Sequence, residues 1–259
     1  MELLDLLSPK NIVGFIIVIT RLSGLMISAP LFSTYPIPMQ VKAWLVALIA
    51  FIMFPVVSAS STFFVPTDML SMSLVLFKEL AIGFFIGLMA NFIFAGVQMA
   101  GQLISQQVGL AMSSVLDPAT QTNVPVLGEF YVLITTMLFL SLGAYQWLFA
   151  AVFESFKKIP PGIDLVFSPA LIQQVLKLSS DMFVISLGVV MPIFCVLFVL
   201  EILIGVLAKM APQMNLFMVA IPFKIYIGLI LMLIFLSPMS DYLSDLIQSH
   251  LGTVLKMFM

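Results

Sequence analysis

Residues 80–116, LAIGFFIGLMANFIFAGVQMAGQLISQQVGLAMSSVL, contain no charged side chain. As a single α-helix they would extend for roughly 55 Å at a rise of about 1.5 Å per residue, whereas the hydrocarbon core of a bilayer is only about 30 Å thick. The run is therefore too long to be one straight membrane span. Its character also changes at Asn91, because the residues before it are apolar and those after it include several glutamines.

The rest of the chain has the same apolar character. Of the 259 residues, 62% are hydrophobic and 8% are charged, whereas soluble proteins have roughly 25% charged residues. This composition excludes a soluble globular domain and predicts an all-α integral membrane protein. Six apolar segments are expected, near residues 11–29, 43–57, 74–104, 126–153, 182–207 and 214–236. No long polar region separates them, so a single domain over residues 1–259 is expected.

Prolines interrupt this pattern at defined places. Ala29-Pro30 is expected to end the first helix, because proline disfavours the helical conformation of the residue before it. Pro192 lies inside the fifth segment and Pro222 near the start of the sixth. Since proline also removes a backbone donor, these two helices are predicted to be broken or bent.

The scarcity of reactive side chains excludes several kinds of site. The formal net charge is -2 and no basic run is present, so nucleic-acid binding is not expected. Cys195 and His250 are the single cysteine and histidine, which is too few for a Cys/His zinc site. No metal, cofactor or catalytic residue is predicted, and an intramembrane enzyme would have to use His250 as its base.

Glutamines recur at helical spacing in the second half of residues 80–116. Gln98, Gln102 and Gln106 fall on one helical face, and Gln107 follows directly. Amides facing lipid would lose their hydrogen bonds, so this face must meet polar protein or water. Two interpretations remain open: hydrogen bonding between helices, or the wall of a pore that passes polypeptide without binding it tightly.

Small residues are also spaced for close helix packing. They include Gly83, Gly87, Gly96 and Gly101. Packing is the ordinary role of such residues in membrane helices, and their presence on several faces suggests a helix surrounded by protein.

Charged side chains within or beside the apolar segments must be paired or solvated, because an isolated charge is costly in hydrocarbon. We expect buried charge pairs among Arg21, Lys78, Glu79, Glu201, Lys209 and Lys224. Glu201, Gly205 and Lys209 share a helical face, which suggests a buried ion-pair seam. An ion-coupled transporter could use the same groups, for example Glu201 with Lys224.

A pliable segment with one charge follows the glutamines. Its turn-forming and polar residues are Gly109, Ser113, Ser114, Asp117, Pro118, Thr120, Gln121 and Asn123, it ends at Pro125, and it contains Met112. Glycine, proline, asparagine and serine are typical of loops.

Taken together, several fragments resemble the FliR family of bacterial flagellar export-gate proteins, whose relatives serve the injectisome type III secretion systems. The first is Arg21-Leu-Ser-Gly24 to Ala29-Pro30, and the second is Lys78-Glu79 before Gly83 and Gly87. The others are Ala100-Gly101 leading to Gln107 and Gly109, Asp117-Pro118, Phe139-Leu140, Ser155-Phe156 with Pro160, and Ala211-Pro212 to Phe217 before Gly228. Where relatives often have Gly-His, this chain has Gly143-Ala144.

The resemblance implies a non-enzymatic core subunit of a protein-export channel in the bacterial inner membrane, at the flagellar basal body. It implies broken helical hairpins packed into a spiral with P- and Q-type subunits, near larger A- and B-type export proteins. The segment from Gly109 to Pro125 would be a plug in the pore, and unfolded polypeptides would be the cargo. The main alternative is a small-molecule secondary transporter with discontinuous helices.

Overall fold

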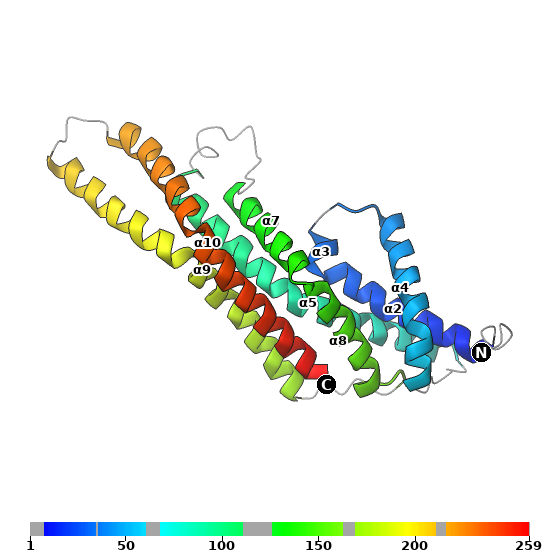
Figure 1. Ribbon diagram of the computed structural model, residues 1–259. Helices are drawn as coiled ribbons and strands as arrows, with labels where there is room; N and C mark the ends of the chain where they lie inside the picture. Colours follow the sequence, from blue (N-terminus) through cyan, green and yellow to red (C-terminus); the bar gives the residue numbers. More distant parts are fainter. Residues whose placement is uncertain are drawn as a thin grey trace. The chain divides into compact units, whose positions relative to one another are not determined.

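The computed structural model describes residues 8–34, 36–60, 68–110, 126–162, 169–210 and 216–258. Over these ranges the chain forms helices and no strand, which confirms the all-α prediction (Figure 1). In chain order the helices are α2 (Pro9–Ser28), α3 (Pro30–Ser33), α4 (Met39–Ser60), α5 (Met69–Val108), α7 (Val126–Ser141), α8 (Ala144–Lys158), α9 (Pro169–Met210) and α10 (Leu216–Phe258).

Five helices are long and apolar enough to cross a membrane: α2, α4, α5, α9 and α10. The shorter helices α7 and α8 follow each other across a break at residues 142–143, and together they could form a sixth span. Gly143 makes this break, because its φ of +63° lies in the left-handed region that favours glycine. The predicted six apolar segments correspond to these spans.

The chain divides into two compact units. Unit 1 comprises residues 1–92, 143–179 and 247–259, and unit 2 comprises residues 93–142 and 180–246. Three helices, α5, α9 and α10, contribute to both units. A single domain over residues 1–259 stays a prediction.

In unit 1, α2 packs against α4, and the rings of Phe15 and Phe54 meet edge-on with centroids 5.8 Å apart (Figure 1). As predicted from the sequence, α2 stops before Pro30, which begins the short helix α3. Ile17, Leu22 and Leu25 are fully buried side chains of α2. Burial of such side chains contributes about 1.5–3 kcal/mol each, measured against the exposed side chain in water.

The helix α5 has 40 residues without interruption. At about 1.5 Å per residue this is roughly 60 Å, about twice the thickness of a hydrocarbon core. Residues 69–92 of this helix belong to unit 1, and the glutamine-bearing part from Ile93 belongs to unit 2. Helix α5 is therefore not an ordinary membrane span.

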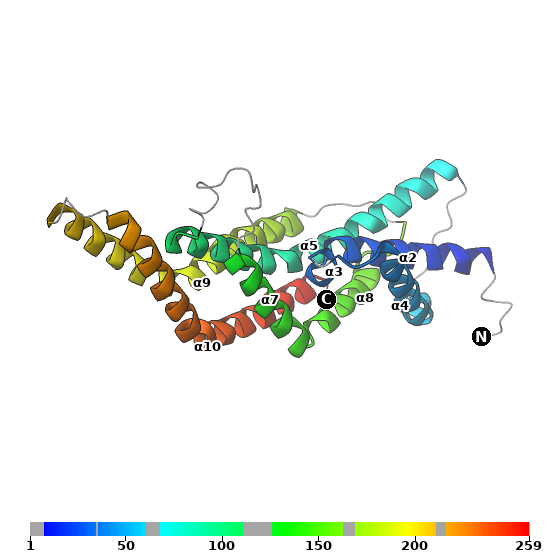
Figure 2. The ribbon, with the colours of Figure 1, turned by 90° about the horizontal axis from the view of Figure 1, so that it is seen from above.

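Of the two predicted outcomes, broken or bent helices, the structure shows no break, because α9 continues through Pro192 and α10 through both Pro222 and Pro238. Both helices instead change direction within unit 2 (Figure 2). Proline removes one backbone hydrogen bond, while the bonds on either side hold the helix together. A cavity of about 270 Å³ lies between α9 and α10, lined by Gly188, Pro192, Phe235, Pro238 and Tyr242 among others.

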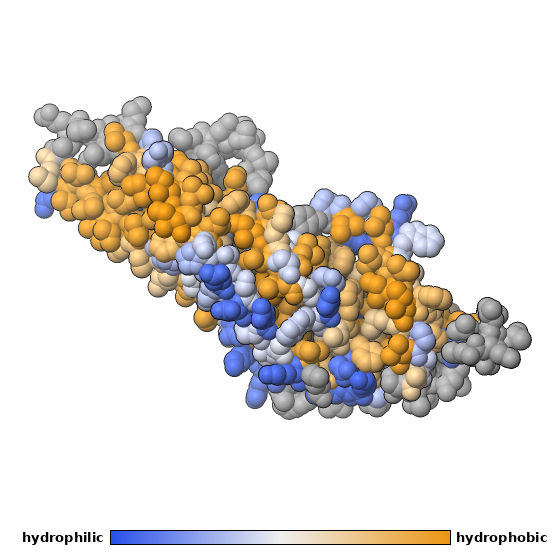
Figure 3. Space-filling model, viewed as in Figure 1, coloured by the Kyte–Doolittle hydropathy of each residue, from blue (hydrophilic) through white to orange (hydrophobic). Residues whose placement is uncertain are grey.

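Large apolar side chains remain exposed on α4 and α9, as the orange surface in Figure 3 illustrates for one face. On α4 they include Trp44, Leu48 and Phe51, and on α9 they include Phe198 and Ile202. Patches of this kind in a membrane protein face lipid or other subunits.

Candidate functional site

The amide stripe, Gln98, Gln102 and Gln106, lies on the exposed face of α5 in unit 2. None of the three amides forms a hydrogen bond with any other residue that the structure describes. Within the described part of the chain, these three side chains are exposed.

The opposite arc of α5 is buried. Ala100, Ile104 and Val108 have no exposed surface. This burial results from close packing, since a side chain at Gly96 would clash with Met182 and Ile185 of α9. The same holds for Gly101, which lies against the backbone of Leu127 and Gly128 in α7. One arc of the helix is therefore apolar and packed, and the other is polar and open.

Gln107 points away from the amide stripe and contacts α9. Its Nε2 donates a hydrogen bond to Glu201 Oε2 at 3.0 Å. On the other carboxylate oxygen, Glu201 Oε1 accepts a bond from Lys224 Nζ of α10 at 3.2 Å. Glu201 thus joins the end of α5 to both α9 and α10, all within unit 2.

The predicted buried seam of Glu201, Gly205 and Lys209 is not found in this chain. All three residues are exposed, and a side chain at Gly205 would meet no described residue within 4 Å. Lys209 lies two helical turns beyond Glu201, about 12 Å along the axis, which is too far for a direct ion pair. Lys224 reaches Glu201 because α10 brings it alongside.

Helix α5 ends in a Schellman motif at Gly109. The Gly109 N–H donates to the Gln106 carbonyl, and the Leu110 N–H donates to the Ser105 carbonyl, both at 3.1 Å. Gly109 has a φ of +93°, a conformation that is strained for any residue with a Cβ. The remaining residues predicted as a plug, Met112, Ser113, Ser114, Asp117, Pro118, Thr120, Gln121, Asn123 and Pro125, lie outside the described residues.

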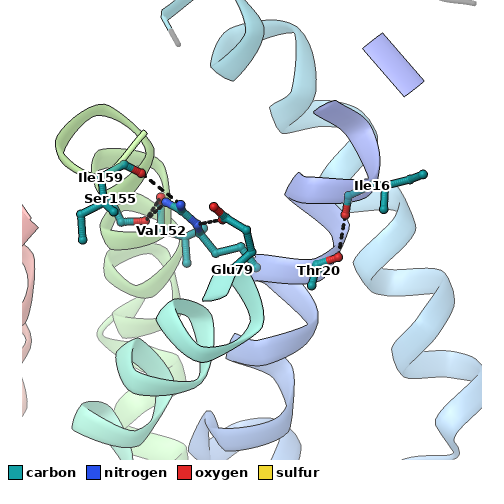
Figure 4. Close-up of polar contacts among 7 residues, drawn as sticks. Ile16, Thr20, Glu79, Val152, Ser155 and Ile159 are labelled. Carbon is teal, nitrogen blue, oxygen red and sulfur yellow. Dashed lines mark hydrogen bonds and ion pairs between the residues drawn. The ribbon is translucent and has the colours of Figure 1, made fainter. Parts of the chain in front are cut away.

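A second polar cluster lies deep in unit 1. Arg21 has no exposed surface, and its Nε donates to Glu79 Oε2 at 2.6 Å. Its Nη1 donates to Ser155 Oγ at 2.9 Å, and its Nη2 donates to the Ile159 carbonyl at 3.1 Å (Figure 4). The guanidinium also stacks on the ring of Phe156 at 3.8 Å. A single side chain of α2 thereby connects α5 with α8 and the residue after it.

Glycines allow Arg21 to reach these partners. A side chain at Gly83 of α5 would overlap the Arg21 carbonyl, and one at Gly24 of α2 would overlap the backbone of Leu80. Gly87 likewise lies against the backbone of Ala29. The two backbones approach closely, and the Ser28 hydroxyl donates to the Phe84 carbonyl across the contact at 2.7 Å.

His250 is a packed residue in unit 1. Only 6% of its surface is exposed, and Nε2 lies 3.0 Å from the Met89 carbonyl, to which it can only donate. Over the described ranges, no group of three or more His, Cys, Asp or Glu side chains is arranged to hold a metal. Through its contact with the Met89 carbonyl, His250 fastens α10 to α5.

The sequence indicated Arg21 and Glu79 but not their other contacts. Ser155 and Phe156 were identified only through family resemblance, because a serine and a phenylalanine in an apolar helix give no signal of binding an arginine. Gly128, which faces Gly101, was also missed. The one signal in the sequence was that Gly128 is a small residue near the start of an apolar helix, where small residues allow close helix packing.

Residues 12–250 match the family described as bacterial export proteins, family 1. The chain is 30% identical over 212 residues to the flagellar biosynthetic protein FliR of Escherichia coli strain K12, covering 82% of this chain and 80% of that protein. It is 27% identical over 228 residues to FliR of Bacillus subtilis strain 168, covering 86% of each. It is 26% identical over 185 residues to the Yop proteins translocation protein T of Yersinia pestis, covering 70% of each.

Proposed function

The chain belongs to family 1 of the bacterial export proteins, and we propose that it is a core subunit that helps to form the polypeptide-conducting pore of the flagellar export gate. As a family member it is a component of a flagellar or type III export apparatus, located in the inner membrane at the flagellar basal body. In the proposed role the chain lines the pore and assembles with P- and Q-type subunits, near the A- and B-type export proteins. It has no enzymatic activity of its own in this role.

The observation that carries the proposal is the contrast between the two arcs of α5. Three uncharged amides, Gln98, Gln102 and Gln106, are exposed on a helix whose opposite arc is fully packed. A lipid-facing position would leave their donors and acceptors unsatisfied. Neutral amides can exchange hydrogen bonds with water and with passing peptide groups without holding any one sequence, which suits a conduit for unfolded polypeptide.

The exposed surface of α9 is evidence in favour of partner subunits. Glu201 has 56% of its side chain exposed within a membrane-length helix. Phe198 and Ile202 beside it are also exposed. A charge among apolar side chains is unsuited to lipid, so this surface is expected to meet protein or a wet passage.

The segment from Gly109 to Pro125 is proposed to obstruct the idle pore. The support comes from its sequence, in which Asp117 is the one charged residue, and from its position directly after the amide stripe. Energy for export would come from other components, as the sequence has no GxxxxGK[ST] phosphate-binding loop.

Site-specific photo-crosslinking to a stalled export substrate tests the pore-lining role. A photoreactive amino acid at position 102 or 106 should crosslink to a substrate fused to a stably folded domain that cannot pass the gate. Leu48 on the exposed face of α4 is the matched control, and no substrate crosslink is expected there. If positions 102 and 106 give no crosslink in gates that otherwise export, the pore-lining role is wrong.

A further inference from the structure

Glu201 is the shared acceptor for two donors that come from different helices. One carboxylate oxygen accepts from the Gln107 amide of α5 and the other from the Lys224 ammonium of α10. Bonds in which one partner is charged are stronger than neutral ones and hold their geometry more firmly. The carboxylate therefore bridges the end of α5 and α10.

Gln107 and the amide stripe lie on different sides of α5, so the direction of Gln107 determines the direction of the stripe. Gln107 lies five positions after Gln102, so at about 100° per residue the two side chains point about 140° apart around the helix. When Gln107 is held against α9, the amides of Gln102 and its neighbours in the stripe must point away from α9 and α10.

Gly96 packs closely against α9 and Gly101 against α7, which holds the middle of this part of α5. The contacts nearer its end are apolar as well. Val108 packs on Gly228 of α10, and Gly109 lies near Ile221. These contacts set the distance between the helices. Among the described residues, the amides of the stripe themselves form no hydrogen bond that could orient them.

We propose that Glu201 is a positioning residue that sets the rotation of the end of α5 and so aims the amide stripe at the passage. This inference rests on the pore-lining role proposed above. Lys224 has a supporting part, because its ammonium compensates the carboxylate charge in an apolar setting. Glu201 itself need not touch the exported chain.

The test measures the water accessibility of single cysteines in the assembled gate. In a Cys195→Ala background, Gln102→Cys reports the stripe and Ala100→Cys reports the packed arc. A membrane-impermeant thiol reagent should label position 102 rapidly and position 100 slowly. Glu201→Ala should lower the labelling rate at 102 and raise it at 100, each by about tenfold, which corresponds to the loss of one charge-assisted hydrogen bond.

Further variants separate positioning from folding. Glu201→Gln keeps an oxygen that accepts from Gln107, so it should retain the original labelling pattern. Gln107→Leu leaves the Glu201–Lys224 pair intact and should reproduce the pattern of Glu201→Ala, which keeps the test valid if the latter does not assemble. Asp181→Ala makes the same charge change on the same helix and should leave labelling unchanged.

Two contrary results have different meanings. If Gln107→Leu assembles and labels as the parent does, Glu201 does not set the rotation, while the pore-lining role stands. If position 102 is unlabelled in every assembled variant, the stripe is dry, and the proposed function and this inference fail together.

Discussion

A guanidinium with no exposed surface must have its charge and its donors satisfied inside the fold. At Arg21 this is achieved by the Glu79 carboxylate, the Ser155 hydroxyl, the Ile159 carbonyl and the face of Phe156. Arginine is suited to this place because its planar fork can serve several acceptors at once. Lysine, with a compact ammonium, could not contact all of them.

We therefore expect Arg21→Ala to be strongly destabilising. It leaves the Glu79 carboxylate buried without a partner, and breaking a buried pair in this way costs about 3–5 kcal/mol. The measurement is the fraction of intact complex that is recovered after the purified gate has been heated in mild detergent. The double variant Arg21→Met with Glu79→Leu is the control, and it should recover much of the loss because neither charge remains buried alone. Equal stability of Arg21→Ala and the parent would show that the cluster is dispensable.

Gly83 gives a second prediction at the scale of one residue. In Gly83→Ala the new methyl group would overlap the Arg21 carbonyl, so α2 and α5 must separate. Overpacking of this kind typically costs about 1–3 kcal/mol, and the Arg21–Glu79 bond should weaken with it. The readout is the amount of folded protein in membranes, measured by protease resistance. Gly205→Ala is the matched control, because a side chain at Gly205 would meet no described residue within 4 Å; a comparable loss in both variants would contradict the packing argument.

At the scale of an element, the end of α5 is defined by one glycine. Gly109 adopts a positive φ and closes the Schellman motif with Gln106 and Ser105. Alanine in this conformation costs roughly 1–2 kcal/mol. Gly109→Ala should therefore loosen the last turn of α5, seen as faster hydrogen exchange of the amides of residues 106–110. Gly109→Asn should show a smaller effect, because asparagine tolerates the left-handed region better; unchanged exchange in Gly109→Ala would contradict the assigned cap.

The helices themselves could be largely predicted from the sequence, since apolar length and glycine and proline positions are local signals. The amide spacing likewise predicted a shared face for Gln98, Gln102 and Gln106, and that face is exposed. Which of the charged residues pair with one another could not be decided from the sequence. Glu201 was expected to form a seam with Lys209 on its own helix, whereas Lys224 lies closer in space.

Proline gave a local signal that left two outcomes open. Its lost donor predicted broken or bent helices at Pro192 and Pro222, and α9 and α10 continue through both. The cost of exposing several backbone groups in an apolar setting exceeds the cost of one missing bond, so the helix bends. The alternative of a secondary transporter depended on broken helices and buried charges. Helices α9 and α10 are continuous, while α7 and α8 are separated by a break.

At the scale of the whole molecule, the exposed surface combines apolar side chains with polar groups that need contact with other chains or with water. Trp44 and Phe51 are exposed on α4, and Phe198 and Ile202 on α9 beside the half-exposed carboxylate of Glu201. Apolar residues alone could face lipid. The carboxylate and the open amide stripe on α5 could not, because polar groups in hydrocarbon lose their hydrogen bonds. Other chains and a wet passage would satisfy both.

A passage of this kind must be closed when no substrate fills it, since an open one would dissipate the membrane potential. Removing residues 111–124 should therefore leave an assembled gate that conducts ions, detected as sodium sensitivity of growth and as current in planar bilayers. The Schellman motif at Gly109 lies outside the deletion, so α5 should keep its end and the amide stripe its place. Replacing the same residues with a glycine-serine linker of equal length distinguishes bulk from sequence: if bulk alone closes the passage, the linker variant should be tight. A deletion variant that assembles fully and does not conduct would exclude this segment as the closure.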